Sequence, residues 1–286
     1  MQTVGLSWQH SFETAAVLTA IGGAAALSSN SRIRWIGAFL REAAVIGALY
    51  GLWRLAGRLS LHDSGDAYAR ARWIEHAQDD LFLPDEHSVQ NLILGHKWLV
   101  QGANLYYATM HFTMMFVFLI WVFWRHREHY RPIRQVMAWT TLGCLLIQLV
   151  PVAPPRLYNP DKYVDTAILY GQSVYSNGFA ADQLSAMPSV HVAWCVIVGW
   201  YAWKVGGSRW RWLGPAHAAI TIFVVAATAN HWWLDGIVAT GVLAVAAWSV
   251  FGVRTAWQAA KRRFTPASRP TTPDTPEQPS YAGQTH

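Results

Sequence analysis

Two histidines in this sequence lie beside the polar residues that phosphoryl transfer needs. His191 follows Pro188-Ser189-Val190, and His231 precedes Asp235 by four residues, which is about one helical turn. Because an imidazole titrates near neutral pH, one histidine can attack phosphorus while the other protonates the leaving oxygen. The carboxylate of Asp235 can hold the His231 ring in one tautomer and stabilise its charged form. We therefore predict that His231, His191 and Asp235 are catalytic.

The residues around this group suit a bound phosphate. Ser189 and Asn230 are good N-cap residues, which predicts that His191 and His231 lie in the first turns of their helices. A helix start presents unpaired N–H groups and a partial positive charge, so it can bind an anion. Arg156 adds a guanidinium that can grip phosphate oxygens in a bidentate way. Arg156 and Ser189 are the predicted phosphate-binding residues.

Other polar residues recur at helical spacing. Asn104, Tyr107 and His111 share one face of an apolar segment, where they either line a substrate cavity or make a polar contact between helices. Glu86 and Gln90 lie one turn apart and form either a wall of the site or a solvated helix face, and the solvated face is the preferred interpretation.

The elements that carry these residues are membrane spans. The chain of 286 residues is 53% hydrophobic and 13% charged, and the charged fraction is about half that of a soluble domain. Seven hydrophobic segments can be drawn, at 12–29, 36–59, 104–124, 136–153, 190–204, 213–229 and 232–253. These segments predict an all-α polytopic membrane protein with a six-helix core and an extra N-terminal hydrophobic helix. Whether residues 12–29 cross the bilayer stays open.

The positions of the basic residues predict the orientation in the membrane. They cluster beside apolar segments, near residues 32–34, 125–134, 204–211 and 254–263, which marks cytoplasmic loops rather than a nucleic-acid surface. The acidic residues concentrate between 63 and 86 instead. The expected location is the cell membrane, with the catalytic group on the extracytoplasmic face.

Three parts follow from this organisation: an N-terminal hydrophobic segment (1–35), a membrane-embedded enzyme domain (36–255) and a disordered cytoplasmic tail (256–286). In the polar stretch before the third segment, Ala67 to Leu83 has the pattern of an amphipathic helix. Residues 154–190 form a second loop on the same side. The tail is rich in Pro, Ser and Thr and cannot build a core.

No cofactor or metal is expected. Cys144 and Cys195 both lie in apolar runs, which favours neither a disulfide nor a cysteine metal site. No cluster of His, Asp and Glu has the ligand spacing of a zinc or manganese site.

At Pro188-Ser189-Val190-His191 and His231-x-x-x-Asp235 the sequence resembles the type-2 phosphatidic acid phosphatase superfamily. The preceding Ala153-Pro154-Pro155-Arg156 and the form Ala186-Met187-Pro188-Ser189-x-His191 are similar to its inositol-phosphotransferase-like branch. That branch includes fungal inositol phosphorylceramide synthases. The resemblance covers roughly residues 40–253.

The resemblance implies a six-helix core, no metal and a phosphohistidine intermediate. By resemblance, His231 attacks phosphorus, Asp235 orients it, His191 protonates the leaving group and Arg156 binds phosphoryl oxygens. Two features depart from the family pattern. The first motif, a Lys followed by Arg-Pro, is absent, since Arg131-Pro132 lies on the cytoplasmic side; Val225 replaces the Arg that precedes the catalytic His by six residues.

The expected function is transfer of a phosphoryl or phospho-head group from a lipid phosphate to a lipid or alcohol acceptor. The alternative is a phosphatase acting on prenyl or glycerolipid phosphates. Two further interpretations of the sequence are a haem protein and a protein without catalytic activity. His217 with His231, and His96 with His111, are spaced as haem ligands of a b-type cytochrome, and a non-enzymatic lipid-binding protein could keep the fold.

Overall fold

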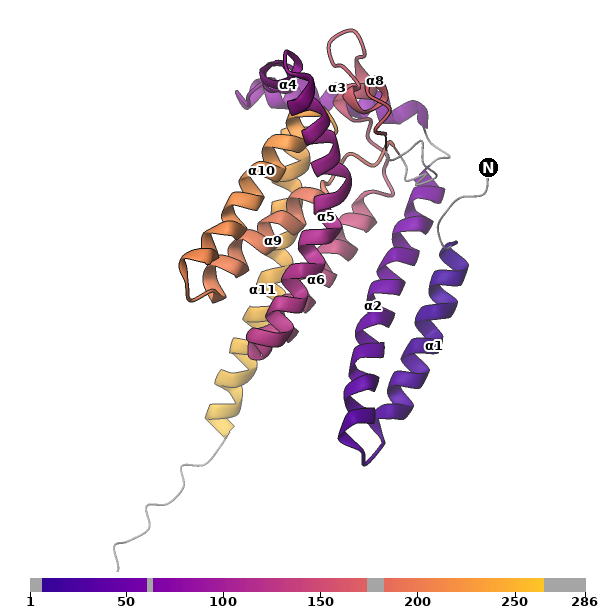
Figure 1. Ribbon diagram of the computed structural model, residues 1–286, viewed down its shortest axis with the longest axis vertical. Helices are drawn as coiled ribbons and strands as arrows, with labels where there is room; N and C mark the ends of the chain where they lie inside the picture. The colour runs from indigo at the N-terminus through magenta and orange to yellow at the C-terminus, as the bar shows by residue number, and fades with distance from the viewer. Residues whose placement is uncertain (1–6, 61–63, 174–182, 265–286) are drawn as a thin grey trace, which may run out of the picture.

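The computed structural model describes residues 7–60, 64–173 and 183–264. Within these residues the chain is helical and has no strand; a single isolated bridge joins Val152 to Ser185. Seven helices run lengthwise through the molecule and are called the long helices (Figure 1): α1 (Trp8–Ala26), α2 (Ser31–Ser60), α5 (Lys97–Arg125), α6 (Arg127–Ile147), α9 (Val190–Val205), α10 (Leu213–Ala227) and α11 (Trp233–Phe264). The remaining elements are α3 (Ser64–Asp80), α4 (Glu86–Leu94), α7 (Pro155–Tyr158), α8 (Thr166–Leu169) and the 3₁₀ turn η1 (Arg209–Trp212).

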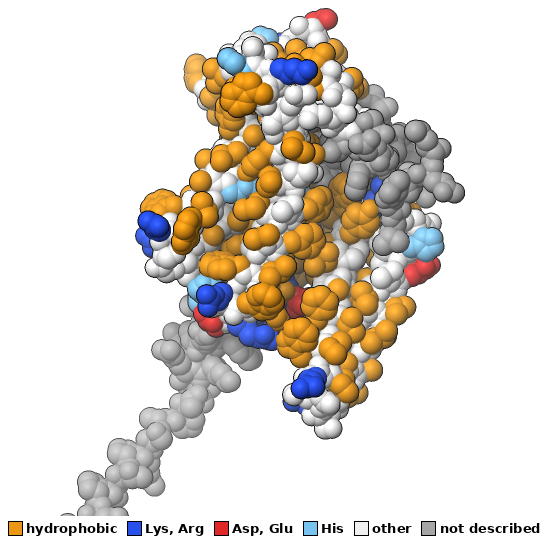
Figure 2. All heavy atoms as spheres, in the orientation of Figure 1, with side chains coloured by type: hydrophobic (Ala, Val, Ile, Leu, Met, Phe, Trp, Pro, Cys, Tyr) orange, Lys and Arg blue, Asp and Glu red, His pale blue; other side chains and the backbone are white. Residues whose placement is uncertain are grey.

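The long helices match the seven predicted segments, and the chain is an all-α polytopic membrane protein. Stretches of α2, α5 and α11 are long and apolar enough to cross a bilayer among the residues described. Hydrophobic side chains cover the outer surface of the long helices, and most of the visible Lys and Arg lie toward their lower ends (Figure 2). Such a surface suits hydrocarbon, where the helix satisfies its own backbone groups.

Helices α5, α6, α9, α10 and α11 form the bundle that carries the predicted catalytic residues (Figure 1). Small residues bring α9 and α10 close together. A Cβ built on Gly214 would lie 2.7 Å from the Cβ of Ala202 and 3.1 Å from the carbonyl oxygen of Val198. Membrane helices use such small residues because van der Waals packing, rather than the hydrophobic effect, holds them together.

Helices α1 and α2 form a hairpin that stands beside this bundle (Figure 1). They pack closely on each other: a Cβ on Gly37 would lie 2.6 Å from the Cβ of Ala25. The contact of the hairpin with the bundle runs mainly from α2 to α6. Glu42 of α2 accepts hydrogen bonds there from Arg134 and from the Tyr130 hydroxyl, the latter at 3.2 Å.

Helices α3, α4 and α8 lie together at one end of the molecule (Figure 1). The predicted amphipathic helix is therefore present as α3. It buries Ala67, Ala71, Ile74 and Gln78 and leaves Trp73 68% exposed. The two predicted polar loops thus share one end, as expected.

The predicted start of the tail is wrong. We expected the tail from residue 256, but α11 continues to Phe264. The long helix persists because residues 236–260 contain no proline and few residues that favour a turn. Residues 265–286 lie outside the described part of the chain.

Candidate active site

His191 and His231 meet at the end of the bundle that α3, α4 and α8 cover. Their ring centroids are 5.4 Å apart, although the two residues come from different helix starts. His231 is 5% exposed, whereas His191 is half-buried. The structure therefore brings together the two histidines that the sequence singled out.

His231 lies before its helix, and the prediction that it sits in the first helical turn is wrong. Helix α11 begins at Trp233, and the segment before it turns through Ala229, whose φ is 52°. Asn230 does not cap this helix. Its amide donates to the hydroxyl of Thr228 at 2.8 Å, and its oxygen accepts from Arg156 at 2.9 Å. Tertiary hydrogen bonds thus replace the local cap that the sequence suggested.

The hydrogen bonds of His231 fix which ring nitrogen carries the proton. Nδ1 lies 2.8 Å from the carbonyl oxygen of Ala186 and 3.3 Å from the Asp235 carboxylate. Both groups can only accept, so Nδ1 must be the donor. In the neutral ring the lone pair is therefore on Nε2. This buried Nε2 has no hydrogen-bond partner among the described residues.

Asp235 is fully buried, and His231 is not the only group that contacts its carboxylate. Its Oδ2 also accepts the backbone N–H of Trp232 at 2.8 Å. The shorter contact of His231 is to Ala186, so the carbonyl is its closer partner and the carboxylate supplies negative charge beside the ring. Sequence reasoning missed Ala186 because a backbone carbonyl carries no residue-type signal.

His191 lies in the first turn of α9, as predicted. The Ser189 hydroxyl accepts the N–H of Val192 at 3.3 Å and caps this helix. Ser189 itself is fully buried, and its hydroxyl serves the cap. The first N–H groups of α9 have no intrahelical acceptor, which leaves this helix start the better anion site of the two.

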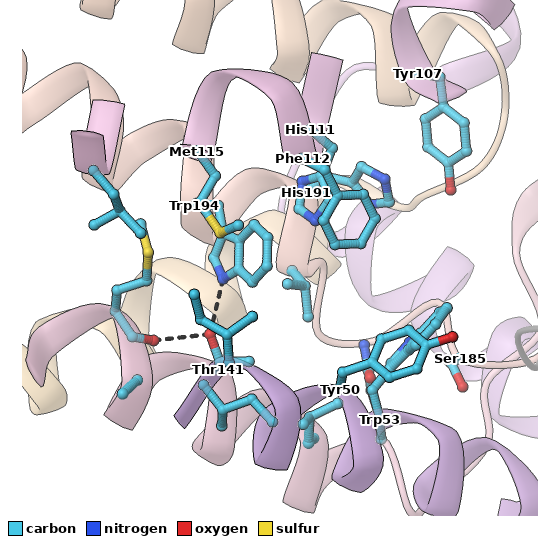
Figure 3. Close-up of a pocket in the computed structure, with 18 of the residues that line it drawn as sticks. Tyr50, Trp53, Tyr107, His111, Phe112, Met115, Thr141, Ser185, His191 and Trp194 are labelled. Carbon is cyan, nitrogen blue, oxygen red and sulfur yellow. Dashed lines mark hydrogen bonds between the residues drawn. The ribbon is translucent and has the colours of Figure 1, made fainter. Parts of the chain in front are cut away.

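Tyr107 and His111 of α5 both pack against His191, and Figure 3 shows His111 beside His191 with Tyr107 to one side. The Tyr107 ring stacks on His191 with centroids 4.5 Å apart, and His111 lies 4.1 Å from it. His111 also stacks on Trp194 at 4.3 Å. Two of the three predicted cavity residues, Tyr107 and His111, therefore contact the site.

Asn104 lies elsewhere. It is 3% exposed, and its amide donates to the carbonyl of Thr166 at 3.0 Å and accepts the Thr166 hydroxyl at 2.9 Å. It is not among the residues that line the cavity described below. Asn104 therefore joins α5 to α8, a contact between elements rather than a substrate contact.

Arg156 is buried next to the catalytic turn. Its backbone N–H donates to the Ala229 carbonyl at 3.1 Å, and its Nε donates to Asn230. The guanidinium also forms an ion pair with Asp165 at 2.5 Å. Arg156 is thus placed beside His231, but a carboxylate already offsets part of its charge.

The start of α11 is capped by two residues from α3 and α4. Glu86 Oε1 accepts the N–H of Trp233 at 2.9 Å, and Gln78 Oε1 accepts the N–H of Leu234 at 2.9 Å. Gln78 also donates to Glu86 at 2.9 Å, so the two side chains hold each other. These acceptors occupy N–H groups at the start of α11 that would otherwise be open to a phosphate.

The preferred interpretation of Glu86 and Gln90 as a solvated helix face is wrong. Glu86 is 1% exposed and Gln90 is fully buried. Gln90 donates to the Val164 carbonyl at 3.0 Å and accepts the Val164 N–H at 2.9 Å. Burial raises the pKa of Glu86 from 4.5 to about 7, against the lowering effect of its hydrogen bonds.

A cavity of about 300 Å³ opens from the two histidines toward the hairpin. His111, His191 and Trp194 of the bundle and Tyr50 and Trp53 of α2 line it (Figure 3). Most of its wall is apolar. Ionisable groups and an apolar cavity therefore share one space, as in a site for an amphiphilic substrate.

The histidines do not pair as the haem alternative requires. His111 lies against His191, and His217 lies 2.6 Å from the Tyr106 hydroxyl through Nδ1. Among the described residues no group of three or more His, Cys, Asp or Glu is placed to hold a metal ion.

A known protein family matches the part of the chain that carries this site. The family model described as the PAP2 superfamily matches residues 72–249, which include His191, His231, Asp235 and Arg156. The chain belongs to the PAP2 superfamily. Searches of curated proteins and of solved structures found no match.

The structure shows where the two departures from the family pattern lie. Arg131-Pro132, the near match to the first motif, lies near the start of α6, about 25 Å along the helix from Gln148, which lies at the histidine end of the cavity. Val225, at the position of the family Arg, is buried, and its carbonyl accepts the N–H groups of Asn230 and His231. Its backbone thus shapes the catalytic turn, while its side chain offers phosphate nothing.

Proposed function

We propose that this PAP2 protein transfers a phosphoryl or phospho-head group from a lipid to an alcohol through a phosphohistidine on His231. The observation that carries the proposal is the buried Nε2 of His231, which has no hydrogen-bond partner among the described residues, while Nδ1 lies against Ala186 and Asp235. A nitrogen with a free lone pair beside a second histidine is the arrangement that nucleophilic catalysis needs.

In the first step Nε2 of His231 attacks phosphorus and the bond from phosphorus to the leaving oxygen breaks. The leaving oxygen takes a proton from His191, which starts as the imidazolium. The His231 ring becomes positively charged, and Asp235 stabilises that charge. Ring centroids 5.4 Å apart support this division of roles, because both rings are close enough to act on one phosphoryl group.

In the second step His191, now neutral, takes the proton of the incoming hydroxyl. The hydroxyl oxygen forms a bond to phosphorus, the bond to Nε2 breaks, and both rings return to their starting states. Two imidazoles perform these proton transfers without a metal, so we propose metal-independent catalysis.

One ion pair favours transfer from a phosphodiester. Arg156, which lies beside His231, pairs with Asp165, so part of its positive charge is already offset. A weakly cationic site suits a diester, which carries one negative charge, better than a monoester, which carries nearly two at neutral pH. This supports the inositol-phosphotransferase-like assignment, with a lipid or alcohol as acceptor.

Hydrolysis is the second candidate, because phosphatases and phosphotransferases both occur in the PAP2 superfamily. Purified protein should be given phosphatidylinositol, prenyl phosphate and phosphatidic acid, each with and without an acceptor lipid. We expect diester turnover that depends on the acceptor. Free phosphate from the monoesters, with no acceptor dependence and no diester turnover, would establish the phosphatase instead.

We further propose that the site faces the extracytoplasmic side of the cell membrane, since the basic segments lie at the opposite end. Asp161 and Ser208 are exposed and lie on loops at the two ends, while both native cysteines are buried. A cysteine at 161 should react with an impermeant maleimide in intact cells, and one at 208 only after permeabilisation. The reverse pattern would place the site in the cytoplasm.

A further inference from the structure

The cavity at the catalytic histidines continues along α2, which lies outside the residues that match the family. One face of α2 lines it through residues at helical spacing: Glu42, Val45, Ile46, Leu49, Tyr50 and Trp53. The opposite wall comes from α5, α6 and α9. The hairpin therefore supplies one side of the cavity.

The cavity is polar at its two ends. His191 and His231 line one end, and Glu42, Tyr130 and Arg134 line the other. Gln148 and Arg134 both belong to the wall and are 14 positions apart on α6, which corresponds to about 21 Å. Between them the side chains are mostly apolar, including Leu49, Met115 and Leu145.

The polar group at the far end is held together tightly. Arg134 donates to Glu42, the Tyr130 hydroxyl donates to the same carboxylate, and the two charged side chains are only 26% and 24% exposed. A hydrocarbon chain that moved past this ion pair would remove the water that still hydrates the two charged groups and would offer them no hydrogen bond in return. This dehydration is unfavourable.

We propose that this cavity takes a single hydrocarbon tail of the lipid substrate, and that the Glu42–Arg134 pair limits the tail length. The proposal rests on the proposed function, because the phosphate of the same lipid sits at His231. A cavity of about 300 Å³ lies at the low end of small-molecule pockets, roughly 300–1,000 Å³, which suits one tail rather than two.

The test uses lysophosphatidylinositols whose one acyl chain is lengthened stepwise. For wild type, each added methylene should raise kcat/KM by up to about fourfold until the tail reaches the ion pair, after which the gain stops. Leu49 lies about 10 Å along α2 from Glu42, so Leu49→Trp should stop the gain at a shorter chain than in wild type.

Leu52→Trp is the matched control, because Leu52 is on the same helix but does not line the cavity. It should reproduce the wild-type series. The double variant Glu42→Leu with Arg134→Met removes both charges together and should move the limit to longer chains. If Leu49→Trp does not fold stably, this double variant decides.

Binding of the same radiolabelled lipids to His231→Ala protein separates this proposal from the proposed function. Suppose that wild type shows no turnover, but that binding has a chain-length limit and adding Leu49→Trp shortens that limit. This result would overturn the proposed reaction and keep the tail site. A limit that is the same in wild type, Leu49→Trp and the double variant, or a series with no limit, would overturn the tail site.

Discussion

The two helix starts that carry the histidines are built differently. Helix α9 is capped by its own Ser189, and His191 lies inside the helix, half-buried at the cavity. Helix α11 is capped by Glu86 and Gln78 from other helices, and His231 lies in the turn before it, almost fully buried. Ser189 caps α9 from within its own segment, whereas the cap of α11 is borrowed from α3 and α4 and ties the start of α11 to those helices.

This difference suits the two proposed roles. A nucleophile must be aimed at phosphorus, since small misplacements reduce rates strongly. A proton carrier must exchange protons with an incoming hydroxyl. The contrast between a firmly oriented His231 and a more exposed His191 can be tested by substituting the two histidines and their supporting residues one at a time.

The largest effect is expected for His231→Ala. It removes the nucleophile, so kcat should fall by about 10⁴-fold or more for every substrate. Steady-state turnover of wild-type and variant protein, with thermal unfolding to check the fold, measures this. Residual activity above a few per cent would remove His231 from the nucleophile role.

His191→Ala should cost about 10²- to 10⁴-fold with natural leaving groups. A donor that releases p-nitrophenolate needs no proton on its leaving oxygen, so it should restore part of the first step to this variant. The same donor should restore nothing to His231→Ala. Equal behaviour of the two variants would contradict the division of roles.

Asp235→Asn should have a smaller effect, on the order of a hundredfold in kcat. An orienting carboxylate that alone sets the tautomer is worth about 10⁴-fold, but here the Ala186 carbonyl accepts from Nδ1 independently. The same kinetics measure it. A loss as large as that of His231→Ala would show that Asp235, and not Ala186, sets the tautomer.

The smallest effect concerns the borrowed cap and is seen in stability. The pKa of Glu86 is raised from 4.5 to about 7, so the folded state keeps this proton where the unfolded state loses it. Protonated Glu86 therefore makes its full contribution to the free energy of unfolding below pH 4.5. This contribution, roughly 3 kcal/mol, is lost as the pH rises through about 7. Gln at this position does not titrate.

The midpoint temperature of thermal unfolding should therefore fall less steeply between pH 5 and 8 for Glu86→Gln than for wild type. Asp80→Asn, on an exposed residue of α3, is the control and should follow wild type. Parallel curves for Glu86→Gln and wild type would mean that the Glu86 carboxyl does not titrate differently in the folded protein.

The contrast between the helix starts also explains what the sequence could predict. Ser189 and Val192 are three residues apart, so local pattern was enough to predict the cap of α9 and the place of His191. The cap of α11 comes from residues 147 and 156 positions earlier in the chain. No local pattern encodes such contacts, so Glu86 was assigned to solvent and His231 to a helix.

The spans were predictable for a similar reason. Apolar runs report membrane helices directly, and all seven predicted segments are helices in the structure. The cavity was only partly predictable, because Tyr107 and His111 lie on one helix with a recognisable face, whereas the contribution of Tyr50 and Trp53 depends on how α2 packs against α6.

The most direct measurement is to trap the covalent intermediate. Purified protein is mixed with a lipid donor labelled at phosphorus, without acceptor, and quenched in alkali, where phosphohistidine survives. We expect label on the peptide that contains His231, none in His231→Ala, and retained label in His191→Ala with the p-nitrophenyl donor. Label on another residue, or turnover of wild type with no labelled protein at any time, would contradict His231 as the nucleophile.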